Sequence, residues 1–104
     1  MIFYDDIKFY QQTKKNKYLP NDDLLVLVLD CCFAEEKQIA GEDYIVVTAL
    51  DSNIERCLLG EDIKNEYSID VKGVLRVRDK EIKTTLEKAT VIPMAPITFY
   101  FKVN

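Results

Sequence analysis

The chain has 104 residues, of which 48% are hydrophobic and 31% charged, and its formal net charge is −4. This length supports a single domain with one core, and the six Tyr and five Phe exclude an intrinsically disordered chain. The longest apolar run, residues 24–29, is far shorter than the ~18 residues of a membrane-spanning helix, so no membrane contact is expected.

Histidine is absent, and the three cysteines stand at positions 31, 32 and 57. Without imidazole, His-containing zinc sites and Ser–His or Cys–His nucleophile pairs are excluded. Neither a CxxC pair nor a Gly-rich phosphate loop is present. We therefore expect no metal, no cofactor and no enzymatic activity. The odd Cys count and the lack of a signal-peptide pattern after Met1 predict an intracellular protein, cytoplasmic or, in a eukaryote, nuclear.

Charge is distributed unevenly along the chain. Residues 1–19 carry four basic and two acidic residues, residues 20–70 carry three and thirteen, and residues 71–104 carry seven and three. The basic cluster of the last segment could contact phosphate, whereas the acidic middle would repel the same polyanion. A sequence-independent nucleic-acid binder normally has an overall basic excess, which this chain lacks.

Residues 1–19 are expected to form an N-terminal helix or arm. Phe3, Ile7 and Tyr10 are spaced by four and three positions, which suits one face of a short amphipathic helix. The same aromatic residues would also suit a strand. A polar, basic stretch follows at 11–17 and predicts a linker.

Residues 20–92 are expected to form five strands. The first, residues 24–33, is a Leu- and Val-rich run typical of a strand that is buried on both faces. A polar loop at 34–43 is expected to precede a β-branched strand at 44–50. A tight hairpin then leads into a third strand at 54–59.

The fourth strand, residues 67–78, shows the clearest alternation. Leu75 and Val77 share the apolar face, while Arg76 and Arg78 lie on the other. Gly73 falls on the apolar side, where a glycine predicts a bulge or a sharp bend.

The last two predicted strands are residues 82–92 and a strand-like tail within residues 93–104. In the former, the apolar parity changes after Leu86, which predicts a bulge near Glu87 and Lys88. In the tail, four alternating apolar residues form a stripe that needs cover: Ile97, Phe99, Phe101 and Val103.

These elements predict an all-β protein, or a β-rich one with a short helix. Five strands, a short second hairpin and a Gly-bent fourth strand describe a small closed barrel, because closure removes exposed sheet edges. The sequence resembles the OB-fold family at Leu50-Asp51-Ser52-Asn53-Ile54, at Ile69-Asp70-Val71-Lys72-Gly73-Val74-Leu75 and at Thr90-Val91-Ile92. The expected architecture is a five-stranded OB-like closed barrel with an extra C-terminal strand.

The resemblance is strongest to the small single-OB subunits of replication protein A and of telomere-capping complexes. It implies a non-catalytic accessory subunit that contacts a larger OB-fold or replication protein in a DNA-maintenance complex. The apolar stripe of the C-terminal tail is the candidate partner-binding surface, either by β-augmentation of a partner or in a homodimer. It could instead pack on the barrel's own surface.

Two alternatives are kept. In the first, the protein binds single-stranded nucleic acid by itself, as OB folds do, through aromatic stacking and basic residues. The candidate residues are Tyr44, Arg56, Lys72, Arg76, Arg78, Lys80 and Lys83, although Tyr44 could be barrel packing and the cations a solvated face. In the second, the protein is a small acidic adaptor or inhibitor, of the phage or mobile-element type, that binds a basic surface on another protein.

Overall fold

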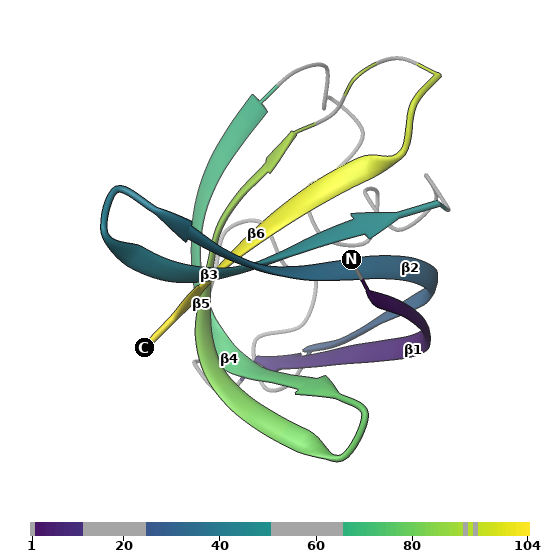
Figure 1. Cartoon of the computed structure of the whole chain (residues 1–104), viewed down its shortest axis with the longest axis horizontal. Coiled ribbons are helices and arrows are strands. Elements are labelled where there is room, and N and C mark those ends of the chain that lie inside the picture. Colours follow the sequence, from purple (N-terminus) through teal and green to yellow (C-terminus); the bar gives the residue numbers. More distant parts are fainter. Residues whose placement is uncertain (1, 12–24, 51–65, 91, 93) are drawn as a thin grey trace.

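The computed structural model describes residues 2–11, 25–50, 66–90, 92 and 94–104, and this part of the chain is all-β (Figure 1). It contains six strands, which are β1 (Ile2–Gln11), β2 (Leu25–Ile39), β3 (Glu42–Ala49), β4 (Glu66–Val77), β5 (Lys80–Thr90) and β6 (Ile97–Val103).

All strand pairings are antiparallel, and they connect the strands in the order β1-β2-β3-β6-β5-β4. β1 also pairs with β4, so every strand has a paired neighbour on both sides. Two three-stranded meanders, β1-β2-β3 and β4-β5-β6, therefore face each other around one interior. The chain passes between them after β3, and β4 returns beside β1, which is a Greek-key connection.

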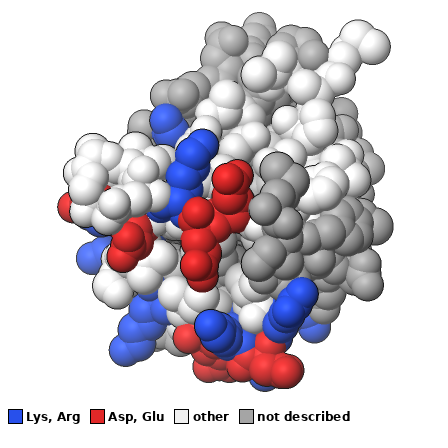
Figure 2. All heavy atoms as spheres, in the orientation of Figure 1, with Lys and Arg blue, Asp and Glu red and all other residues white. Residues whose placement is uncertain are grey.

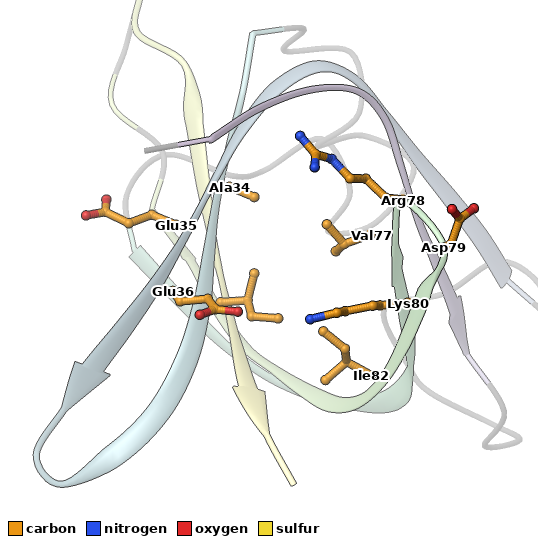
Figure 3. Close-up of a pocket in the computed structure, with 9 residues that line it drawn as sticks. Ala34, Glu35, Glu36, Val77, Arg78, Asp79, Lys80 and Ile82 are labelled. Carbon is orange, nitrogen blue, oxygen red and sulfur yellow. The ribbon is translucent and has the colours of Figure 1, made fainter.

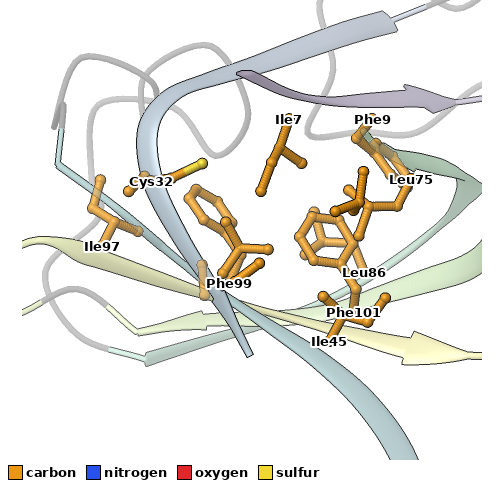
Figure 4. Packing of buried hydrophobic residues seen from close by; sticks show 14 residues of the cluster. Ile7, Phe9, Cys32, Ile45, Leu75, Leu86, Ile97, Phe99 and Phe101 are labelled. Atoms are coloured by element: carbon orange, nitrogen blue, oxygen red, sulfur yellow. The ribbon is translucent and has the colours of Figure 1, made fainter. Parts of the chain in front are cut away.

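The interior is filled by alternate side chains from all six strands (Figure 4). Phe9 of β1 packs against Phe101 of β6 with ring centroids 5.3 Å apart, and Phe99 follows at 6.4 Å from Phe101. Burying each such ring stabilises the fold by about 1.5–3 kcal/mol. The largest fully buried side chains are Phe9, Phe99, Phe101, Ile7, Leu75, Leu86, Ile97 and Val47.

The predicted bulge in β5 is confirmed. Thr84 and Leu86 are buried, and after the register shift between Leu86 and Lys88 the next buried residue is Ala89. The extra residue restores the inward direction of the apolar side chains, as the change of parity in the sequence required.

The bulge offered as one explanation for the glycine at position 73 does not lie at that residue. The register irregularity of β4 lies between Ser68 and Val71, whereas Gly73 pairs regularly with Gln11 and with Thr84. A Cβ at position 73 would overlap the carbonyl oxygen of Tyr10 and lie 2.6 Å from the Phe9 ring. The glycine therefore permits a close approach between β1 and β4.

The N-terminal segment forms strand β1 and not the helix that its spacing suggested. Ile7 and Phe9 are both fully buried, which is the period of two expected for a strand. The prediction of a polar loop at 34–43 is also wrong, because β2 continues to Ile39. The hairpin turn is Ala40–Gly41, and both residues have positive φ, as in a type I′ turn.

The C-terminal strand is not an extra element. β6 lies between β3 and β5, so the sheet has six strands where five and an addition were predicted. Ile97, Phe99 and Phe101 are at most 1% exposed and face the interior, so they do not form a partner-binding surface. Val103 packs against the same core. The predicted strand at 54–59 lies outside the described residues.

Gly73→Ala is expected to lower the free energy of unfolding by about 3 kcal/mol, because the new methyl group must displace the Phe9 ring and the β1 backbone. Gly41→Ala is the matched control, since nothing lies within 4 Å of a Cβ there and the cost is the positive φ alone, about 1 kcal/mol. Urea denaturation of both variants measures the difference. Equal losses would contradict the close approach.

Thr84→Val is expected to raise the free energy of unfolding by about 1 kcal/mol. The Thr84 side chain is fully buried, and its Oγ1 has no hydrogen-bond partner among the described residues, so a methyl group of the same size removes a desolvation cost. Thr85→Val is the control, because the Thr85 hydroxyl faces outward and donates to Oδ1 of Asn104 at 3.2 Å. A clear loss of stability in Thr84→Val would show that its hydroxyl is satisfied.

Candidate functional site

The outer surface of β1, β4 and β5 carries most of the basic side chains predicted to bind nucleic acid. Leu75 and Val77 point inward, so the alternate positions of β4 point outward. Strand pairing places Lys8 of β1 opposite Arg76 of β4, and Tyr10 opposite Val74 in the next row. We call this surface the basic face, and it comprises Lys8, Tyr10, Lys72, Val74, Arg76, Arg78 and Lys83.

Two cations are held side by side on the basic face. Lys8 and Arg76 are directly paired across β1 and β4, an arrangement of like charges that opposes sheet pairing. Glu81 is opposite Arg76 on β5, with 4.0 Å between the charged atoms, and both side chains are at least half exposed. Such an ion pair contributes little. Because Lys8 and Arg76 carry like charges on directly paired positions, a bound anion would stabilise the cluster.

A small polar cavity of about 200 Å³ lies at the end of the basic face. It is lined by Lys8, Arg76, Arg78 and Asp79. Three of these four side chains are cations that donate hydrogen bonds, and an arginine fork matches the oxygens of a phosphate group.

A cavity of about 380 Å³ opens where the β2–β3 and β4–β5 hairpins face each other (Figure 3). We call it the larger cavity because its volume exceeds that of the small polar one. Its apolar part is formed by Ala34, Ile45, Val77 and Ile82. The charged residues at its rim come from opposite sides, with acidic ones on β2 and basic ones on the β4–β5 hairpin. They are Glu35, Glu36, Arg78, Asp79 and Lys80.

A further cavity of about 500 Å³ adjoins this opening and shares Glu36, Ile45 and Ile82 with it. Tyr44 of β3 lines this second cavity together with Val103 of β6. The two cavities together hollow this end of the sheet.

Tyr44 is held by a local polar network. Its hydroxyl donates to Oε1 of Glu87 at 2.9 Å, and this hydrogen bond, with burial and the negative charge of Glu87, raises the pKa of Tyr44. Beside it, Lys102 forms an ion pair with Glu42 at 2.7 Å, which raises the pKa of Lys102. Tyr44 is therefore a positioned side chain of β3 and does not lie on the basic face.

The residues predicted to bind nucleic acid therefore lie at different places in the fold. Lys72, Arg76, Arg78 and Lys83 belong to the basic face, Lys80 lines the larger cavity, and Tyr44 lines the adjoining one. Arg56 lies outside the described residues. The face shown in Figure 2 has basic side chains around its lower end, where Figure 1 places the β4–β5 hairpin, with acidic ones between them.

Sequence reasoning missed Lys8 and Tyr10 because their segment was expected to be a helix or an arm. The period-two pattern of a strand was present in the sequence, since Lys8 and Tyr10 alternate with Ile7 and Phe9, which are buried. With β1 paired to β4, these two residues complete the basic face.

Other kinds of site find no counterpart in the described part of the chain. No group of three or more Cys, Asp or Glu side chains there could hold a metal ion, and the Cys32 side chain is buried in the core. No helix in the described ranges is long and apolar enough to cross a membrane.

Comparisons with known proteins give no relative for this chain, because no family model, no curated protein and no solved structure matches it. The interpretation of these surfaces therefore depends on their own geometry and charge.

Proposed function

We propose that this protein is a non-catalytic binding protein that holds single-stranded nucleic acid on its basic face. The observation that carries the proposal is the direct pairing of Lys8 with Arg76, next to Arg78, at a small polar cavity. Two neighbouring cations repel each other, and a bound polyanion offsets that repulsion.

The basic face also has the aromatic component that single-strand binding uses. Tyr10 is half-buried and lies one row beyond the Lys8–Arg76 pair, opposite Val74, which in turn is opposite Lys83. A base stacked on Tyr10 would have cations on both sides for its phosphates, since outward positions on one strand repeat every ~6.6–6.8 Å.

The acidic remainder of the chain is consistent with this function. The net charge of −4 combines a basic C-terminal third with an acidic middle. A polyanion is repelled by the acidic segment and attracted to the basic face, so the charge distribution favours one docking orientation.

An OB-like barrel is the architecture that we propose for this binding. Its support is the Greek-key return of β4 beside β1 and the ring of strand pairings, both features of small Greek-key barrels. The described sheet differs from the five-stranded OB pattern in having six strands, all antiparallel.

A second candidate is the accessory subunit that contacts a larger replication protein. Its support is a group of exposed apolar side chains at one end of the neighbouring strands β3, β6 and β5. Leu50 follows β3, Ile92 follows β5 and Met94 precedes β6, with 50%, 59% and 105% exposure. A subunit that only contacts protein would bind no oligonucleotide, even at low salt.

The test is a fluorescence anisotropy titration of a ~30-nucleotide single strand at low and near-physiological salt. The wild-type protein is expected to bind with an affinity that falls steeply with salt. Arg76→Glu should weaken binding by about tenfold and reduce the salt slope by about one, because it removes a phosphate contact and adds repulsion.

Lys88→Glu is the matched control for this titration. It makes the same change in net charge, but Lys88 lies over the Tyr100 ring, 4.6 Å from its centroid, and outside the basic face. Its affinity should stay within about twofold of wild type. Absence of binding at low salt would refute the proposed function, and equal weakening by both variants would show that binding is not on the basic face.

A further inference from the structure

Two exposed charged residues continue the inward-facing rows of β2 and β5 at the open end of the sheet. Along β2, the inward positions Cys32 and Ala34 are buried, and the next inward position is Glu36, opposite Ile45 of β3. Along β5, inward Ile82 and Thr84 are preceded by Lys80 at the start of the strand. At this end of the sheet, the inward-facing row of β2 therefore continues with the acidic Glu36, and that of β5 begins with the basic Lys80.

Figure 3 shows how these side chains lie in the larger cavity. The Glu36 carboxylate and the Lys80 ammonium extend from opposite walls toward the space between them, and the Arg78 guanidinium extends into the same space. The carboxylates of Glu35 and Asp79 point away from it. Within the described residues, neither Glu36 nor Lys80 makes an ion pair. The cavity thus offers two separate charged groups to a ligand.

The cavity adjoins the basic face. Arg78 and Asp79 line both the small polar cavity of that face and the larger cavity. A nucleic-acid strand whose phosphates follow Lys8 and Arg76 therefore reaches Arg78 at the rim of the larger cavity. The next nucleotide can place its base inside.

The chemistry of the cavity selects the kind of base. The apolar part formed by Ala34, Ile45, Val77 and Ile82 can contact the face of a base, and about 380 Å³ is within the range of pockets for ligands of this size. Arg78 and Lys80 suit its phosphate. On the opposite wall, the Glu36 carboxylate has two acceptor oxygens and needs donors.

Guanine presents two adjacent donors, N1–H and N2–H, on its Watson–Crick edge, which a carboxylate can accept together. Thymine, uracil, adenine and cytosine do not present two adjacent ring-edge donors there. We propose that the larger cavity is a base-binding subsite that prefers guanine at the end of a bound strand, with Glu36 as the specificity-determining residue. This inference rests on the proposed function of the basic face.

The test compares three strands of about twelve nucleotides in the same anisotropy assay. One contains thymidine alone, one has guanosine at both ends, and one has inosine at both ends, which lacks the N2 amino group. The wild-type protein is expected to bind the guanosine strand about tenfold more tightly than the thymidine strand, with the inosine strand between them.

Glu36→Gln is expected to remove the guanosine preference, because an N–H donor replaces one of the two carboxylate acceptors and meets the donors of guanine. Glu35→Gln is the matched control, since its carboxylate points away from the cavity, and it should keep the preference. Circular dichroism melting verifies that both variants fold.

Three results would overturn the inference. Equal binding of all three strands by wild type would refute the guanine subsite and leave the basic-face function standing. A preference that survives Glu36→Gln would place base selection elsewhere. Absence of binding to every strand at low salt would refute the proposed function and this inference with it.

Discussion

The packing of Phe9 against Phe101 across the interior, at 5.3 Å between ring centroids, holds the two meanders against each other. It joins the first strand of one meander to the last strand of the other, and it requires a residue without a side chain at Gly73, directly beside the Phe9 ring. Because β1 is held against β4 in this register, Lys8 meets Arg76 on the outer surface. The hydrophobic core thus determines the geometry of the basic face.

The same sheet separates three kinds of chemistry. Its interior is apolar, its outer surface over β1, β4 and β5 is basic, and its end between the two hairpins is a cavity with an acid and a base on opposite walls. Both hairpins have two-residue turns, which keep their strands in register up to the tips. Positions near each tip therefore remain aligned, so that Glu36 and Lys80 extend the inward-facing rows of the core.

Local sequence pattern could predict the strands in which one face is continuously apolar. The bounds of β6 and the bulge after Leu86 are examples, because period-two alternation and its interruption are visible without knowing the neighbours. The strand β1 could not be distinguished from a helix, since Phe3, Ile7 and Tyr10 fit both periods. The role of Gly73 depends on Phe9, which is distant in sequence, and the interior place of β6 depends on pairing. The basic face needed that pairing too, because its cations come from separate segments.

The proposed function requires that nucleic acid binds to the outer surface of β1, β4 and β5. Nuclear magnetic resonance of the ¹⁵N-labelled protein, titrated with a ~30-nucleotide single strand at low salt, tests it most directly. We expect the amide signals of the basic face to shift most, followed by those of the β4–β5 turn. The residues concerned are Lys8, Tyr10, Val74, Arg76 and Lys83. Shifts confined to β3 and β6 around Tyr44 and Tyr100, or no shifts at all, would contradict it.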